Sequence, residues 1–290
     1  MVKRLRAAEK QVKAMFRAIP RTSTRQTQIV NAERVTVYDY DYDPQIFSAA
    51  TQSIINEQLL ETDDGVMPFF WFWKTDIELP YRQGTTEELR DFNQLIAGAI
   101  AAGTLVNGFP PQVINIEEVL LSPDYRQTLG DIQGKNFTTV KGLSDKVSAQ
   151  VIQRVNDGIA AGQSPTKIAQ DITDRFEVAE SDAKRISNTE VNKAYTDAKI
   201  NAAKLAEKRT GLRAAVLHVS ALTPTTRSWH AARHGKAYRP DDQLRWWNQG
   251  ANRINCKCSV TTVLIDRKGR VINTGIQDNL IAQRPFFDDA

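Results

Sequence analysis

The chain is poor in the residues that stabilise small secreted proteins. Its 290 residues include only two cysteines, Cys256 and Cys258, and they are separated by a single residue. A disulfide between residues this close would be strained, and a single bridge of this kind cannot form a disulfide framework. The sequence therefore excludes the class of small, disulfide-stabilised extracellular domains.

Long apolar runs and the common catalytic motifs are also missing. No segment approaches the roughly 18 apolar residues that a membrane-spanning helix needs, so we expect no membrane partner. The basic start, MVKRLRAAEKQVKAMF, lacks the apolar core and cleavage site of a signal peptide, so we expect no export. There is no Gly-rich phosphate loop, no G-x-S-x-G motif and no kinase motif set. These absences predict that the protein is not an enzyme.

Positive charge is concentrated at the N-terminus. The net charge of the whole chain is +4, yet residues 1–30 alone carry a clear excess of cations. The basic residues of this segment are Lys3, Arg4, Arg6, Lys10, Lys13, Arg17, Arg21 and Arg25. Such a basic segment can bind the phosphates of double-stranded DNA without reading their sequence. It could equally be a solvated helix face, or dock on an acidic protein partner.

The periodicity predicts several elements in the first half of the chain. An amphipathic helix is expected over residues 2–19, and the polar stretch that follows it is expected to be mobile. A strand is expected over 35–42, followed by a helix from Pro44 to about Leu60 with Asp43 as its N-cap. The aromatic run from Phe69 to Trp73 is expected in the core or at a subunit interface, in preference to stacking on nucleic-acid bases.

Helices are expected to dominate the middle of the chain. Further helices are predicted from Thr85 and from Pro123, the second of them short. The strongly helical region 138–210 is expected to break at Gly162, restart after Ser164 as N-cap, and close at Gly211.

The sequence pattern changes from helical to mixed strand and helix after Gly211. Strand, helix, strand and hairpin are expected in turn, with the helix over TTRSWHAARHGK and the second strand over INCKCSVTTVLID. The predicted fold class is α+β, predominantly α-helical, with a small C-terminal unit containing a few antiparallel strands. The predicted segments are a basic helix or arm (1–30), a mostly helical region with the aromatic cluster (31–137), a helical segment (138–210), a small α+β unit (211–272) and a tail (273–290).

All three histidines and both cysteines fall in this small unit. His230 and His234 are four residues apart and would share one face of a helix, while Cys256 and Cys258 would share one face of a strand. Two imidazoles and two thiolates form a donor set suited to a structural Zn²⁺. Three alternatives stay open for these residues: buried packing of free thiols, a strained disulfide, and histidines that bind phosphate or backbone. A Cys–His nucleophile pair is a further, weaker alternative.

The same region resembles a known protein family. The segments AKRISNTEVNKAYTDAKINAA, TTRSWHAARHGKAY and NQGANRINCKCSV resemble the phage head-morphogenesis family, the minor head proteins of the Mu F-like type. The matching motif residues, over roughly 140–265, are Thr189, Glu190, Thr226, Arg227, His230, Gly235, Asn255, Cys256 and Cys258.

The resemblance implies a structural minor capsid protein of a tailed phage. Such a protein acts at or near the portal vertex, with the portal protein and the major capsid protein or scaffold as partners and packaged double-stranded DNA as a further expected contact. It would assemble in the host cytoplasm and reside in the virion head. Two alternatives remain: a metal-dependent, nuclease-like DNA-processing enzyme and a nonspecific DNA-binding module. We expect the motif to hold the fold together, with Arg227 and Asn255 tying strand to helix by hydrogen bonds.

Overall fold

The computed structural model describes residues 1–27, 34–61, 70–103, 112–272 and 274–284. The chain forms two compact units, and each takes two separate stretches of sequence. Unit 1 contains Met1–Trp73 and Asp131–Ser187, and unit 2 contains Lys74–Gly130 and Asn188–Ala290. The five consecutive segments expected from the sequence are therefore grouped differently, because two long helices each contribute to both units.

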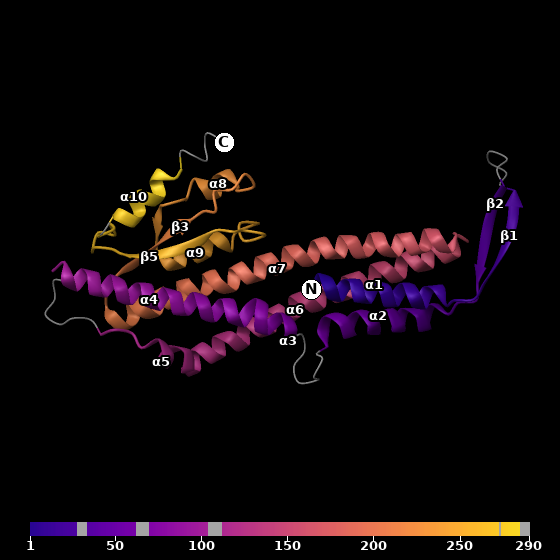
Figure 1. The fold of residues 1–290 in the computed structure, drawn as a ribbon, viewed down its shortest axis with the longest axis horizontal. Helices are drawn as coiled ribbons and strands as arrows, with labels where there is room; N and C mark the ends of the chain where they lie inside the picture. The colour runs from indigo at the N-terminus through magenta and orange to yellow at the C-terminus, as the bar shows by residue number, and fades with distance from the viewer. Residues whose placement is uncertain (28–33, 62–69, 104–111, 273, 285–290) are drawn as a thin grey trace. The chain divides into compact units, whose positions relative to one another are not determined.

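Unit 1 is helical apart from a two-stranded ribbon (Figure 1). Its elements are α1 (Val2–Arg17), β1 (Arg21–Thr27), β2 (Arg34–Tyr40), α2 (Pro44–Leu60), α3 (Phe70–Phe72) and parts of α6 (Pro123–Ala160) and α7 (Pro165–Thr210). Helix α1 buries one apolar stripe, and the predicted start of α2 is confirmed: the Asp43 carboxylate accepts from the backbone N–H groups of Gln45 and Ile46. Phe72 and Trp73 are buried, as expected of a core cluster, and Phe69 lies outside the described residues.

The polar stretch after α1 is a strand, so the expectation of a mobile segment was wrong. Strand β1 pairs with β2 in antiparallel register, with Arg21 opposite Tyr40. Its polar composition lacks the alternating pattern of a half-buried strand, and pairing with β2 supplies its backbone hydrogen bonds instead. The ribbon docks on the loop between α6 and α7, where the N–H of Tyr38 donates to the carbonyl of Gly162 at 3.0 Å.

Two predicted helix boundaries in the middle of the chain were also wrong. The Thr85 motif does not begin a helix, because the chain is already helical in η1 (Trp73–Glu78), a π-helical turn, and in α4 (Leu79–Ala101). Thr85 is buried, and its hydroxyl donates to the carbonyl of Tyr81 one turn earlier. The short helix expected from Pro123 continues to Ala160 as α6.

The restart of the helical region after Gly162 is confirmed. Gly162 has a φ of +62°, and the Lys167 N–H donates to the Ser164 hydroxyl at the start of α7. Helix α7 then runs without interruption to Thr210, and Gly211 follows with a φ of +71°. Among the described residues, no helix is both long enough and apolar enough to cross a bilayer.

Unit 2 holds the C-terminal strands and confirms the predicted fold class. Besides the ends of α6 and α7 it contains α4, α5 (Ile116–Leu121), β3 (Ala214–Val219), α8 (Ser228–Ala231), β4 (Ala237–Tyr238), α9 (Pro240–Trp247), β5 (Ser259–Leu264) and α10 (Gly275–Ala282). The sheet is antiparallel with strand order β4-β3-β5, and His218 is the register partner of Val260. Helices α9 and α10 were not predicted, although Pro240 and the acidic first turn of α9 are a helix-start signal.

Side chains from α7 and the sheet form the core beneath the C-terminal motifs. Ile200 and Ala203 of α7 pack with Val216 of β3, Val260 of β5 and Trp247 of α9. Cys256 and Cys258 belong to the same buried cluster. The sequence motif therefore lies where helix meets sheet within unit 2.

Candidate functional site

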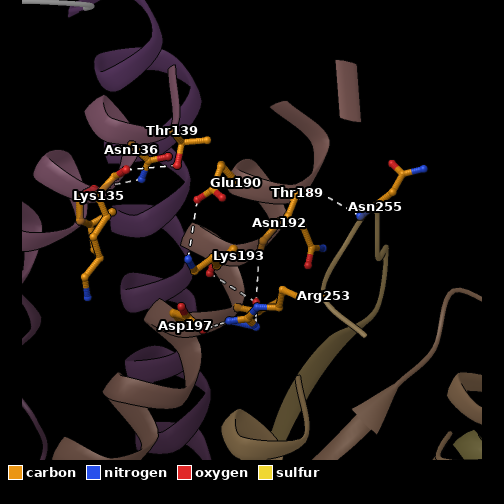
Figure 2. A network of polar contacts seen from close by, with 12 residues as sticks. Lys135, Asn136, Thr139, Thr189, Glu190, Asn192, Lys193, Asp197, Arg253 and Asn255 are labelled. Carbon is orange, nitrogen blue, oxygen red and sulfur yellow. Dashed lines mark hydrogen bonds and ion pairs between the residues drawn. The ribbon is translucent and has the colours of Figure 1, made fainter. Parts of the chain in front are cut away.

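The site is built on a loop that connects α9 to β5 and lies along α7. Asn255, in this loop, has a φ of +51°, a left-handed conformation that asparagine tolerates better than most residues. Its backbone N–H donates to the Thr189 hydroxyl at 2.9 Å (Figure 2). Its side-chain oxygen accepts from the Asn188 amide at 3.2 Å. Two motif residues that are far apart in sequence, Thr189 and Asn255, thus hold the loop against the helix.

A buried arginine anchors the same loop. Arg253 is 8% exposed and forms an ion pair with Asp197 of α7 (Figure 2). Its guanidinium also donates to the Thr196 hydroxyl and lies over the Trp247 ring, 4.7 Å from the ring centroid. Burial lowers the pKa of Arg253 to about 10, so it is charged at neutral pH. The sequence analysis missed this residue, because nothing in the motif distinguishes it from a surface arginine.

The two cysteines lie in the loop just before β5, and not in the strand as expected. Strand β5 begins at Ser259, so the alternation of strand side chains does not place the two thiols together. A tight turn brings them together instead, with the Cys258 N–H 3.3 Å from the Cys256 sulfur. Both side chains are buried, and both cysteines are free.

The histidines do not share a helical face either. Helix α8 ends at Ala231, one turn before His234, so His230 and His234 point to different places. His230 Nδ1 lies 3.4 Å from the Cys258 sulfur and 3.5 Å from the Cys256 sulfur. His234 Nδ1 accepts instead from the backbone N–H of Ser220 at 2.9 Å. The structure thus brings three of the four expected donors together and leaves His234 apart from them.

His218 of β3 takes the place that His234 was expected to fill. The donor atoms of His218, His230 and Cys258 all lie within 4.8 Å of one another. His218 is fully buried, and burial, reinforced by the nearby Arg233 charge, lowers its pKa to about 3. The imidazole is therefore neutral at physiological pH. The sequence did not indicate His218 as a donor, because it lies in an apolar strand. Only the pairing of strands in the sheet places it opposite the loop before β5.

His218 Nδ1 is hydrogen-bonded to a polar side chain of α9. The side-chain amide of Gln243, in α9, is hydrogen-bonded to His218 Nδ1 at 3.0 Å, and its oxygen accepts from Arg233 at 2.9 Å. His218 Nε2 is buried and has no hydrogen-bond partner among the described residues. Trp246 packs against both imidazole rings. Its ring centroid lies 5.3 Å from that of His218 and 4.8 Å from that of His230.

The two thiols affect each other's protonation. The Cys258 side chain donates to the Cys256 sulfur, which lowers the pKa of Cys256 and raises the pKa of Cys258. The His230 ring beside Cys256 also lowers the pKa of that thiol.

Arg227 contacts both the loop before β5 and His230. Its guanidinium donates to the carbonyl of Ile254 at 2.7 Å, and a second nitrogen lies 3.4 Å from both the carbonyl of Asn252 and His230 Nε2. Gly235, the last motif glycine, has a φ of +74°, and a side chain there would meet Ile281 of α10. Glu190 is half-buried and lies 3.8 Å from Lys193 of the same helix.

A cavity of about 280 Å³ opens beside the cluster. The residues lining it are Ala221, Thr223, Thr225, Thr226, Arg227, His230, Asn255, Cys256, Lys257 and Cys258. These lining residues include no carboxylate that could act as a general base. The cavity gives solvent and small ions a route to the two sulfurs and His230.

The basic residues of the N-terminal segment are largely committed to contacts within unit 1. Arg6 forms a bidentate pair with Glu180, and Lys13 contacts Glu9 and Thr173. Arg4 lies over the Trp71 ring, and Arg21 donates to backbone carbonyls. The side chain of Arg25 lies outside the described residues. The exposed cations of α1 that form no ion pair with another described residue are Lys3, Lys10 and Arg17.

Comparison with known proteins gives one match. Neither the curated proteins nor the solved structures contain a match to the chain. Residues 149–261 match the family model described as Phage Mu protein F like protein, and this range includes every motif residue from Thr189 to Cys258. The resemblance predicted from the sequence is therefore confirmed: over residues 149–261 the chain is similar to the Phage Mu protein F like family of phage head proteins.

Proposed function

We propose that this chain is a structural minor head protein of a tailed phage that acts at or near the portal vertex. The observation that carries the proposal is the family match over residues 149–261. The contacts of the motif residues support a structural role: Thr189, Arg227 and Asn255 all use their polar groups to hold the loop before β5 in place. The partners that follow from this role are the portal protein and the major capsid protein or scaffold.

A nuclease-like enzyme is the competing function, and the local chemistry favours the structural one. The cavity beside the cluster has no carboxylate among its lining residues, and its protein donors are buried side chains that face one another. A hydrolytic metal site keeps an open position for water and a base beside it. We therefore assign no catalytic step to the chain.

The test of the head-protein function is made on phage particles. We expect mass spectrometry of purified heads and proheads to find the chain in a few copies per particle. Co-expression with the portal protein of the same phage should give a complex that co-purifies, whereas co-expression with an unrelated phage's portal should not. Absence from both heads and proheads, together with no portal complex, would refute the proposal.

A role in contacting packaged DNA has one specific observation in its favour. Lys3, Lys10 and Arg17 recur at intervals of seven residues, which places them along one face of α1 at about 10.5 Å spacing. All three are exposed, and none of them forms an ion pair with another described residue. A row of solvated cations on a rigid helix can neutralise successive phosphates of a duplex.

The DNA contact can be measured by its salt dependence. Replacing Lys3, Lys10 and Arg17 together by alanine should reduce the slope of log affinity against log salt by about 2.7, at about 0.9 per phosphate contact. The matched control replaces Lys74, Lys141 and Lys167, which are each held by a carboxylate one turn away. It removes the same charge and should leave the slope close to that of the wild type. Equal slopes in both triple variants would exclude the α1 row as the DNA-binding surface.

A further inference from the structure

We propose that His218, His230, Cys256 and Cys258 bind one Zn²⁺ ion that stabilises unit 2. This donor set differs from the one expected from spacing, because His218 replaces His234. The inference is independent of the head-protein function, since it concerns only how this part of the chain is held together. It rests on the convergence of His218, His230 and Cys258, on the position of the Cys256 sulfur beside His230, and on one buried nitrogen of His218 that lacks a partner among the described residues.

The four donors come from three segments that are separated in sequence. His218 lies on β3, His230 on α8, and both cysteines lie in the loop before β5. All four are buried, with exposures of 0%, 2%, 5% and 2% in sequence order. Two imidazoles and two thiolates are the donor types that Zn²⁺ takes in closed, four-coordinate structural sites. A carboxylate or backbone set suited to Ca²⁺ or Mg²⁺ is absent from this cluster of described residues.

The distances from His230 to the two sulfurs fit a tetrahedral ion. With metal–sulfur bonds of about 2.3 Å and metal–nitrogen bonds of about 2.0–2.1 Å, the sulfur and nitrogen of a tetrahedral site lie about 3.5 Å apart. His230 Nδ1 lies 3.4 Å and 3.5 Å from the two sulfurs. The Cys256 sulfur also accepts from the Cys258 N–H, a contact that leaves it free to ligate and orients it toward the cluster.

The alternative arrangement is metal-free, with a thiolate that accepts a hydrogen bond from His230. It would leave His218 Nε2 buried without any hydrogen-bond partner among the described residues, which is unfavourable. A metal ion bound at Nε2 satisfies this nitrogen. Ligation then places the His218 proton on Nδ1, so the Gln243 amide must turn its oxygen toward His218 and give up its bond from Arg233.

A metal ion would also explain how so small a sheet is stabilised. Strand β4 contains two residues, and α8 contains four. Such short elements bury little surface and hold together better when a ligand links them. The cavity beside the cluster gives the ion a route to the two sulfurs and His230.

The test begins with the full chain, stripped of metal by a chelator under reducing conditions and titrated with Co²⁺. Cobalt absorption reports tetrahedral geometry, and a sulfur-to-cobalt charge-transfer band reports thiolate ligation. We expect one cobalt per chain, displaced by Zn²⁺, and a higher Tm after Zn²⁺ addition. X-ray absorption on the zinc-loaded wild-type protein should count two sulfur and two nitrogen ligands, and this measurement requires no variant to fold.

Two histidine variants separate the proposed donor set from the one expected from spacing. His218→Gln should weaken metal affinity by more than the roughly 10–100-fold that follows from losing a ligand's hydrogen-bond partner. His234→Gln removes a buried histidine from the same unit and should leave the metal affinity close to that of the wild type. The inference is overturned if Co²⁺ gives no charge-transfer band and Zn²⁺ leaves Tm unchanged, or if His234→Gln abolishes binding while His218→Gln retains it.

Discussion

His218 of β3 is hydrogen-bonded through Nδ1 to the side chain of Gln243 in α9, at 3.0 Å. This contact joins the sheet to the helix that follows it, and it controls which nitrogen of His218 carries the proton. Because Arg233 donates to the Gln243 oxygen, the amide nitrogen faces His218. The pair therefore opposes metal binding at Nε2 until the amide turns over.

Gln243→Glu should raise the affinity for Zn²⁺. A carboxylate can accept the Nδ1 proton of His218 with one oxygen and pair with Arg233 with the other, so no contact has to be given up when the metal binds. Gln243→Leu removes the contact altogether and should lower the affinity about 10–100-fold. Competition with a chelator of known affinity measures both effects. Equal affinities in the two variants would show that Gln243 does not orient His218.

Glu88 of α4 should make the stability of the protein fall as pH rises through the acidic range. It is fully buried, and although Lys199 Nζ lies 3.5 Å from one of its oxygens, burial raises its pKa to about 7. The folded state then keeps this proton between the ordinary value of 4.5 and about 7, where the unfolded chain has lost it. The contribution of Glu88 to the free energy of unfolding falls over that window by at most about 3 kcal/mol and is level above it.

Thermal unfolding from pH 4 to pH 8 checks this expectation. Glu88→Gln has no proton to lose, so its Tm should rise relative to that of the wild type between about pH 4.5 and pH 7. His218, whose pKa is lowered to about 3, contributes a rise in stability with pH that is common to both proteins and cancels in this difference. Glu87→Gln is the matched control, since the neighbouring carboxylate has its pKa lowered by the Tyr195 hydroxyl and titrates below this window. A Tm difference between Glu88→Gln and the wild type that does not change with pH would contradict the prediction.

Asp197→Ala should be strongly destabilising because it leaves Arg253 buried without its counter-charge. Breaking a buried ion pair from one side costs about 3–5 kcal/mol, and the partial exposure of Asp197 places this pair toward the lower end. Arg253→Met keeps the packing against Trp247 and removes the charge. The double variant should therefore be more stable than Asp197→Ala alone, as measured by urea unfolding. If the two single losses in the free energy of unfolding simply add in the double variant, the unpaired charge of Arg253 is not the cause of the destabilisation.

Two glycines of α4 should respond oppositely to alanine. A Cβ on Gly84 would lie 2.4 Å from the Tyr195 carbonyl oxygen of α7, and a backbone atom cannot easily yield. Gly84→Ala should therefore cost about 1–3 kcal/mol through overpacking. Gly98 has nothing within 4 Å of the corresponding position, so Gly98→Ala should gain about 0.5–1 kcal/mol of helix stability. Chemical denaturation of both variants tests whether α4 and α7 approach as closely as described.

Local signals in the sequence determined the helices with clear termini and the region of the functional motif. Asp43 with Pro44, and Ser164 with Pro165, predicted the starts of α2 and α7, because a capping oxygen and a fixed proline φ act within one turn of the chain. Clustering of every histidine and cysteine after residue 211 predicted the candidate site. The motif order predicted the family that residues 149–261 match.

Only the tertiary structure decided which donors meet. The spacing of His230 and His234 suits a longer helix, but α8 ends at Ala231, so the two rings diverge. His218 joins the cluster because antiparallel pairing places β3 beside β5, and strand pairing depends on contacts distant in sequence. The two cysteines meet through a loop turn held by Thr189 and Arg227, which lie on other elements. Short-range patterns cannot specify such contacts, since their free energy arises only when the whole unit packs.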